Sequence, residues 1–347
     1  MLGVAVVAPG SPDLSAWPWA EVQLAAQERD LRLVAADHLD ADADQTMVVA
    51  TDWTREVQRM LERGARPAAL VTCASPITAW RLYYELEQVS ARFPHTFMFE
   101  GARERVAPIT RFHPLYAPVP CPPPRPTGLP WPNRRFLVAL ADNQATPGLR
   151  DLLRWFDNPR EVSVRRTLAG VRYRPIARDR YQARLRAFEA FSTHADFDLF
   201  GAGWQRRHPA VDPELHAATI RAYRGRAPDT EVVSLLAKYR FALVYENTRF
   251  PGYITDTILH CFFARCIPIY SGAPDVAQYI PPSAFIDVRQ FVTFPELERF
   301  LMGITEDDAR RYVDAAHAFL ISPAFESWCV DRFARDLVEA LVQVAEA

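Results

Sequence analysis

Residues 238–291, KYRFALVYENTRFPGYITDTILHCFFARCIPIYSGAPDVAQYIPPSAFIDVRQF, hold two apolar runs separated by a polar turn and a helix-like stretch. The first run, Phe241–Tyr245, is rich in β-forming residues and stops at Glu246-Asn247-Thr248. The second run, Cys266–Tyr270, stops at Ser271-Gly272. The pattern predicts strand, turn, helix and strand in that order.

The turn between the two runs has the residues that end one element and begin another. Pro251 and Gly252 interrupt the chain, and Thr255 is expected to cap a helix whose first turn carries Asp256. Open α/β sheets bind ligands where a strand end leads into a helix N-terminus, because the free N–H groups and the helix dipole favour phosphate. Without other information, Glu246-Asn247 could equally be a solvated turn, and Asp256 an acid favoured by the dipole.

The first third of the chain repeats this alternation of short apolar runs and amphipathic stretches. Strands are expected at Val4–Ala8, Leu33–Ala36, Met47–Ala50, Ala69–Cys73 and Thr96–Phe99, with helices at 19–29, 54–64 and 76–91. After residue 133 we expect a strand at Arg135–Ala141, a helix at about 180–193 and a strand at Phe197–Phe200. Strand–helix alternation predicts parallel sheets covered by helices.

Residues 113–133 contain nine prolines and are predicted to form neither a helix nor a central strand. We therefore expect a first domain at 1–113, a Pro-rich linker at 114–133 and a second domain at 134–347, with the terminal helix able to cross back. Two Rossmann-like domains around such a joint predict an α/β fold of GT-B architecture, with substrate in the cleft between the domains.

Composition excludes several classes of function. The net charge of −2 gives no electrostatic support for a nucleic-acid partner. The five cysteines form no CxxC pair and are expected to be reduced thiols, and no histidine pair has ligand spacing. Asp40-Ala41-Asp42-Ala43-Asp44 lacks the apolar flank of a metal-binding D-x-D motif and is expected to be an acidic turn. With no signal peptide and no membrane span, we expect a cytoplasmic protein, at most peripheral to the membrane.

Ordered motifs in residues 238–291 resemble the donor-binding signature of the α-1,3/1,4-fucosyltransferases, glycosyltransferase family 10. The pieces are Lys238-Tyr239-Arg240-Phe241, Glu246-Asn247-Thr248, Gly252 to Thr257, Pro268 to Gly272 and Ala284 to Phe291. The resemblance is close over about residues 180–300, loose at 95–108 and absent before that. It implies a GT-B fold and a donor site containing Glu246, Asn247, Tyr253, Thr255 and Asp256.

Two further segments resemble the family more briefly. Ala183-Arg184-Leu185-Arg186 resembles a segment whose first arginine contacts the diphosphate, so Arg184 is implied as a donor contact, with Arg186 as the alternative. Glu100 follows an apolar strand, as does the family's implied general base, and Glu104 is its rival. A solvated arginine-rich face and a surface acid are the plain alternatives.

The resemblance implies an inverting enzyme that transfers L-fucose from GDP-fucose to an N-acetylglucosamine-containing glycan, as in the synthesis of bacterial surface polysaccharide, with no metal or other cofactor. The chain departs from the family at Thr257, where the family has a lysine beside the diphosphate. That departure leaves two alternatives open, a transferase that uses another GDP-sugar and a non-catalytic nucleotide- or glycan-binding relative.

Overall fold

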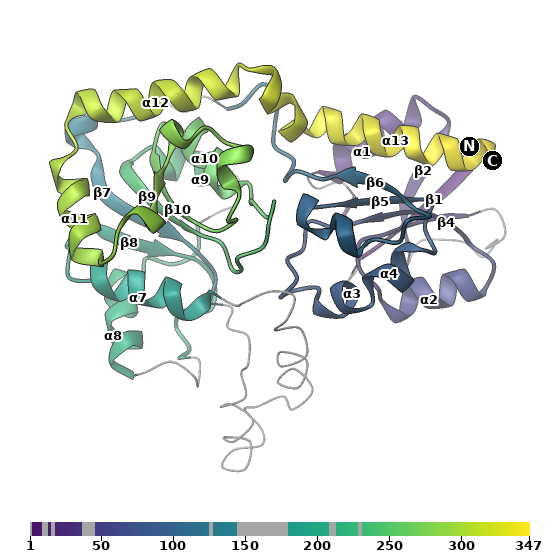
Figure 1. The fold of residues 1–347 in the computed structure, drawn as a ribbon, viewed down its shortest axis with the longest axis horizontal. Helices are drawn as coiled ribbons and strands as arrows, with labels where there is room; N and C mark the ends of the chain where they lie inside the picture. Colours follow the sequence, from purple (N-terminus) through teal and green to yellow (C-terminus); the bar gives the residue numbers. More distant parts are fainter. Residues whose placement is uncertain are drawn as a thin grey trace, which may run out of the picture. The chain divides into compact units, whose positions relative to one another are not determined.

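A computed structural model describes residues 2–8, 13–14, 18–36, 46–124, 128–143, 180–207, 213–227 and 231–347 of the chain. The acidic run at Asp40, Asp42 and Asp44 and the arginine-rich stretch before residue 180 lie outside these ranges. The chain divides into two compact units, one of Met1–Cys121 with Phe325–Ala347 and one of Pro122–Ala324. Each unit is an α/β layer structure (Figure 1).

Unit 1 is built on a six-stranded sheet in the order β2-β1-β3-β4-β5-β6, in which every pairing is parallel. Its strands are β1 (Leu2–Val7), β2 (Leu31–Ala35), β3 (Met47–Ala50), β4 (Arg66–Val71), β5 (His95–Met98) and β6 (Arg111–Pro114). The five strands expected in this region are confirmed, each to within three residues. The sixth, β6, was not expected because it contains Pro114, which the sheet accommodates at its edge.

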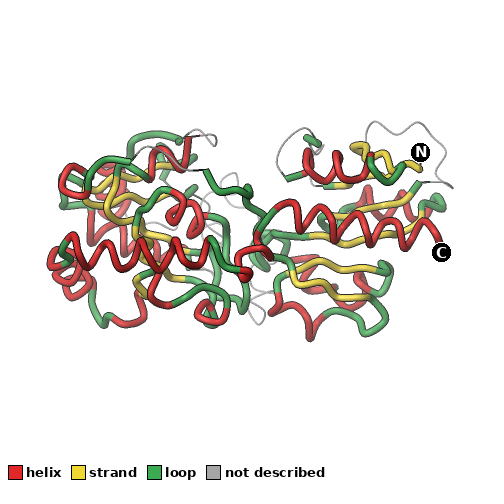
Figure 2. The backbone as a smooth tube through the Cα atoms, turned by 90° about the horizontal axis from the view of Figure 1, so that it is seen from above, coloured by secondary structure: helices red, strands yellow, loops and turns green. Residues whose placement is uncertain are grey.

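Helices cover both faces of this sheet. They are α1 (Trp19–Gln27), α2 (Arg55–Glu62), α3 (Trp80–Tyr84), α4 (Leu86–Ser90) and α13 (Val330–Glu346). The chain's last helix, α13, packs beside α1 and lies across the strands on one face, while α2 to α4 lie on the other (Figures 1 and 2). The helix expected at 76–91 is interrupted, because Glu85 leaves helical geometry between α3 and α4.

Unit 2 contains a five-stranded parallel sheet in the order β11-β10-β9-β7-β8. Its strands are β7 (Arg135–Leu140), β8 (Phe197–Phe200), β9 (Tyr239–Tyr245), β10 (Ile267–Ser271) and β11 (Ile286–Asp287). Its helices are α7 (Tyr181–Phe191), α8 (Pro213–Ala222), α9 (Val232–Leu236), α10 (Thr257–Phe263), α11 (Phe294–Gly303) and α12 (Glu306–Leu320). The two sheets form the pair of Rossmann-like domains that the sequence predicts for the GT-B class.

The first unit extends further along the chain than the sequence suggests. It reaches Cys121 rather than residue 113, because Val119 pairs with the segment that leads into α13. The Val119 N–H donates to the Trp328 carbonyl at 2.8 Å, and the Val330 N–H donates to the Val119 carbonyl at 3.0 Å. The terminal helix therefore belongs to unit 1, although it follows the last helix of unit 2.

A disulfide between Cys121 and Cys329 joins the same two segments. The expectation that all five cysteines are reduced thiols is therefore wrong for this pair, while Cys73, Cys261 and Cys266 take no part in a disulfide. The partners are 208 residues apart, so their spacing in the sequence carried no signal of the bond. Folding brings them together because α13 returns to the first sheet. Among the helices of the described ranges, none combines the length and apolar character needed to cross a bilayer.

Candidate functional site

The strand order of unit 2 places a topological switch point between β7 and β9. From β7 the sheet extends to β8 on one side, and to β9, β10 and β11 on the other. Successive connections that leave in opposite directions open a crevice beyond the carboxyl ends of the two central strands, where sheets of this kind bind ligands. β7 ends at Leu140 and is followed by Asp142 and Asn143, and β9 ends at Tyr245 and is followed by Glu246 and Asn247.

The start of α7 brings two arginines to this edge of the sheet. The Arg180 backbone N–H donates to the Asn247 carbonyl at 3.0 Å, and its Nη2 donates to the Ser271 Oγ at 3.2 Å. One turn later, Arg184 Nη2 donates to the Asp142 carbonyl at 3.0 Å. The two guanidinium groups therefore lie at the carboxyl ends of β7, β9 and β10, where Arg180 contacts Asn247 and Arg184 contacts the Asp142 carbonyl.

The two arginines proposed for the α7 segment have different environments. Arg184 is 7% exposed and lies over the Tyr181 ring at 5.4 Å, whereas Arg186 is exposed. The Tyr181 hydroxyl in turn contacts Asn143 Oδ1 in the loop after β7. This packing fixes Arg184 against the strand ends and leaves Arg186 on the solvated face.

Two polar atoms at the end of β9 are buried without a hydrogen bond among the described residues. They are the Tyr245 hydroxyl and the Asn247 side-chain oxygen. Burial raises the pKa of Tyr245, while the nearby Arg180 charge acts in the opposite direction. Buried polar atoms normally have partners, so a ligand with complementary donors and acceptors would stabilise this edge.

Glu246 is held in a buried position between these groups. It is 4% exposed, and its Oε1 accepts hydrogen bonds from the Thr255 N–H at 2.8 Å and the Thr255 hydroxyl at 3.2 Å. Burial raises the pKa of Glu246 to about 8, although the bonds from Thr255 act to lower it and the neighbouring Asp256 charge raises it further. At neutral pH the carboxyl group is therefore mostly protonated.

Gly272 explains how β10 approaches this carboxyl so closely. A Cβ atom at position 272 would lie 2.3 Å from both Glu246 Cγ and the Tyr270 hydroxyl oxygen. Only glycine permits the contact, so the Ser271-Gly272 end of the second apolar run is part of the site's construction.

The helix after the turn starts one residue later than the sequence suggests. α10 begins at Thr257 with Asp256 at the N-cap position, and the Asp256 side chain makes no capping bond. The expectations that Thr255 is the N-cap and that Asp256 lies in the first turn are therefore wrong. Thr255 bonds instead to the Glu246 carboxyl, which replaces the helix N–H groups as its partner.

Tyr253 lies in the turn that leads to this helix and is only 5% exposed. The turn is shaped by Gly252, which adopts a φ of 68° and donates its N–H to Asp275 Oδ1 at 2.9 Å. Glycine adopts a left-handed φ readily, which explains why position 252 is a glycine.

Arg180 is the cation of this site that the sequence did not single out. Arg265 follows α10, where its carbonyl accepts a bond from Arg134 at the amino-terminal end of β10, opposite to the site. Arg249 is exposed in the turn after Thr248. The only sequence signal for Arg180 was its position at the expected start of the helix at about 180–193.

Glu100 belongs to unit 1, where it opens the 3-10 helix Glu100–Arg105 just after β5. Its Oε2 accepts a hydrogen bond from Arg103 Nη2 at 3.1 Å, and its side chain is 38% exposed. Glu104 is exposed on the same short helix. Both carboxylates are accessible, and Glu100 is the one fixed in direction by a partner.

Within the described ranges, no three histidine, cysteine, aspartate or glutamate side chains gather as a metal site would require.

The family model "Glycosyltransferase family 10 (fucosyltransferase) C-term" matches residues 177–319, which include α7, β9, α10 and β10. The alpha-(1,3)-fucosyltransferase FucT of Helicobacter pylori is 43% identical over 61 residues, 18% of this chain and 13% of that protein. Alpha-(1,3)-fucosyltransferase 4 of Mus musculus is 30% identical over 159 residues, 43% of this chain and 32% of that protein. The matched region thus spans about a third or less of these relatives.

Among solved structures, an alpha1,3-fucosyltransferase resembles the whole chain with a TM-score of 0.55 at 15% identity, covering 100% of this chain and 90% of that one. A structure of an alpha1,3-fucosyltransferase with GDP-fucose resembles the chain with a TM-score of 0.52 at 15% identity, covering 100% of this chain and 90% of that one. A DNA-modifying beta-glucosyltransferase follows with a TM-score of 0.50 at 9% identity over 99% and 100% of the two chains. At these identities the likeness shows a shared fold.

Proposed function

The chain carries the C-terminal domain of glycosyltransferase family 10 over residues 177–319, and from this premise we propose that it transfers L-fucose from GDP-fucose to a glycan. The observation that supports the proposal most directly is the placing of two arginines at the β7–β9 switch point, where Arg180 bonds to Asn247 after β9 and Arg184 bonds to the Asp142 carbonyl after β7. A nucleoside diphosphate is the ligand class that such a site, with two guanidinium groups at parallel strand ends, would hold.

The proposed reaction is an inverting displacement. The acceptor hydroxyl attacks the anomeric carbon of fucose as the bond to the diphosphate breaks, and the diphosphate leaves with its increased negative charge. Arg180 and Arg184 stabilise that charge, since preformed cations help most where charge develops in the transition state. Glu100 accepts the proton of the acceptor hydroxyl as general base. No metal takes part in the proposal, because the arginines supply the positive charge.

The remaining donor contacts follow from the turn after β9. Asp256 accepts hydrogen bonds from the ribose hydroxyls, and Tyr253 donates to a phosphate oxygen. Glu246 supports both from behind, because its carboxyl fixes Thr255 and hence the path of the chain into α10. The acceptor is an N-acetylglucosamine-containing glycan of the kind found in bacterial surface polysaccharide, and the enzyme works in the cytoplasm or at the membrane surface.

Thermal stabilisation by nucleotides tests the donor. GDP and GDP-fucose should raise the melting temperature, and UDP-sugars should not, because a ligand that binds only the folded state stabilises it. Asp256→Ala should remove most of the shift through loss of charge-assisted bonds of about 1.5–3 kcal/mol. Equal shifts with GDP and UDP would contradict the donor assignment, and a GDP-mannose arm separates fucose from another GDP-sugar.

Product formation tests the transfer itself. The full chain with GDP-fucose and N-acetyllactosamine should yield a fucosylated product by mass spectrometry, at a rate unchanged by EDTA. GDP-fucose binding without any product across a panel of glycans would leave a nucleotide-binding relative instead. Loss of the rate with EDTA, restored by a divalent ion, would contradict the metal-free mechanism.

A further inference from the structure

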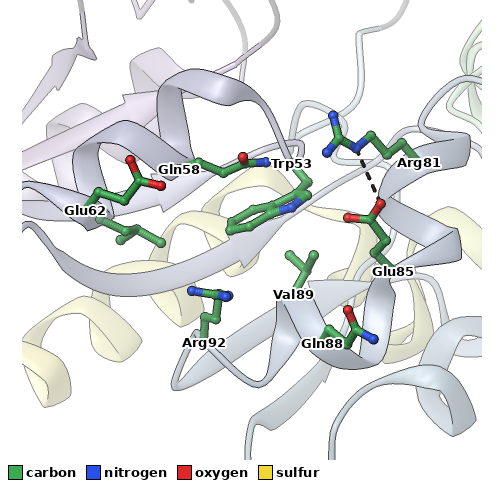
Figure 3. Close-up of a pocket in the computed structure, with 9 residues that line it drawn as sticks. Trp53, Gln58, Glu62, Arg81, Glu85, Gln88, Val89 and Arg92 are labelled. Carbon is green, nitrogen blue, oxygen red and sulfur yellow. Dashed lines mark ion pairs between the residues drawn. The ribbon is translucent and has the colours of Figure 1, made fainter.

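A concave site lies in unit 1, between α2 and α4 on the face of the sheet away from α13 (Figures 1 and 3). Its cavity volume is about 400 Å³, which is within the range of about 300–1,000 Å³ for small-molecule sites. We call it the Trp53 groove, after the indole at its centre. Its polar lining comprises Trp53, Gln58, Glu62, Arg81, Glu85, Gln88 and Arg92.

The position of Trp53 follows from how β3 ends. Trp53 is in the loop at the carboxyl end of β3, and β3 lies on one side of the β1–β3 switch point of the first sheet. The half-buried Asp52 carboxyl accepts the Trp53 N–H at 2.7 Å, and the Thr54 hydroxyl caps α2 by accepting the Val57 N–H at 3.2 Å. The bond from the Trp53 N–H to Asp52 and the cap at Thr54 fix the backbone on either side of Trp53, and the indole extends from this backbone.

The indole has one occupied side. The Arg92 guanidinium carbon lies 5.5 Å from the ring centroid, a distance typical of cation–π contact. The rest of the half-buried ring faces the groove, with Val89 beside it (Figure 3). An aromatic face of this kind binds ligands that offer an apolar patch together with polar groups at its margin.

The charges of the groove balance. Arg81 and Arg92 are matched by Glu62 and Glu85, and Arg81 Nε lies 3.5 Å from Glu85 Oε1. An anionic ligand would meet two carboxylates, and a cationic ligand would meet two guanidinium groups. Carboxylates accept, guanidinium groups donate and the Gln58 amide does both, so the lining suits a neutral ligand with many hydroxyl groups.

We propose that the Trp53 groove binds a neutral saccharide, with the C–H face of a sugar ring on the Trp53 indole and its hydroxyls on the Arg81–Glu85 pair and Gln58. The inference rests on the proposed function, because a glycan is the acceptor there, and it adds a subsite that recognises that glycan within unit 1. The groove contributes binding of the acceptor and takes no part in the chemical step.

Direct binding of N-acetyllactosamine to the full chain, measured by saturation-transfer NMR and calorimetry, tests this subsite. Trp53→Ala should weaken binding at least tenfold and Trp53→Phe should retain most of it. Arg59→Ala, on the exposed side of α2 and outside the groove, is the matched control and should change nothing. An unchanged affinity in Trp53→Ala with an unchanged melting temperature would overturn the proposal, as would tighter binding of a sulfated saccharide that also depends on Trp53.

Kinetic and donor measurements separate this proposal from the proposed function. If both are right, Trp53→Ala raises the KM for the glycan, leaves kcat nearly unchanged and keeps the thermal shift with GDP. Saccharide binding that depends on Trp53 in a protein without a GDP shift or transfer would support the groove and contradict the enzyme. Fucosyl transfer with a KM insensitive to Trp53→Ala would support the enzyme and overturn the groove.

Discussion

Glu246 shows how one buried carboxyl group makes the stability of the fold depend on pH. Its carboxyl group loses contact with water on folding, and burial raises its pKa from 4.5 to about 8. A raised carboxyl pKa means that the folded state binds the proton more tightly than the unfolded state. The resulting stabilisation is complete below about pH 4.5 and is lost as the pH rises through about 8.

The pH dependence of stability should therefore change in Glu246→Gln. In the native protein, this group makes the free energy of unfolding fall between pH 5 and 7.5 by up to about 1.4 kcal/mol per pH unit. The amide oxygen can still accept both bonds from Thr255 but does not titrate, so the variant should have a flatter profile in urea unfolding. Glu87→Gln, on the exposed side of α4, serves as the control. Parallel profiles for native protein and Glu246→Gln would contradict the buried, protonated carboxyl.

Glu100 is the residue on which the proposed proton transfer depends. Glu100→Gln keeps the bond from Arg103 possible but removes the basic oxygen, so the transfer rate should fall by about 10²–10⁴-fold. The thermal shift with GDP should remain, because Glu100 belongs to a different unit from the arginines of the donor site. Glu104→Gln is the matched control. Full activity of Glu100→Gln with an inactive Glu104→Gln would move the base to Glu104.

At the scale of elements, sequence patterns predicted the strands that are apolar runs, missed β6 and β11, and were insufficient for the contacts between strands. Phe241–Tyr245 and Cys266–Tyr270 read as strands because buried parallel strands are continuous apolar runs. The cap at Thr255 was misread because a local rule considers only the helix N–H groups, whereas Glu246 competes for the same hydroxyl. The resemblance placed Arg184 and Asn247 in one site, but it did not reveal Arg180, whose partners Asn247 and Ser271 come from two other elements.

We expect Arg180, at the start of α7, to supply the positive charge that Thr257 lacks because it replaces the family's lysine. Arg180→Ala should reduce transfer by about 10²–10³-fold, the effect of removing one preformed group that stabilises developing charge. Adding Thr257→Lys to Arg180→Ala should restore part of the rate if both positions face the diphosphate. Steady-state kinetics with GDP-fucose measures both effects, and Arg186→Ala on the exposed face of α7 is the control. Normal activity of Arg180→Ala would remove this residue from the proposed site.

At the scale of the whole molecule, the chain passes between its two units at two points, after Cys121 and before Phe325. Both points adjoin the Cys121–Cys329 disulfide, which also lies beside the Val119 bridge and the Tyr116–Trp328 ring pair at 5.0 Å. The disulfide therefore secures α13 to the first sheet at the place where the chain returns from unit 2. Sequence spacing could not indicate this, because the two cysteines are 208 residues apart and meet only where α13 returns to the first sheet.

Disulfide mapping should recover a peptide that joins Cys121 to Cys329 from protein digested without reductant. Cys121→Ser should lower the melting temperature, because an open chain regains the conformational entropy that a loop of this length removes from the unfolded state. In the chain-entropy model the loss is about 5 kcal/mol for loops of 100 residues or more, and native strain reduces it. Cys73→Ser, at an exposed thiol outside the disulfide, should have no such effect. If Cys121 and Cys329 are both alkylated in the native, unreduced protein, the bond is absent, and the backbone pairing at Val119 and the packing of α13 on the first sheet hold the terminal helix to unit 1.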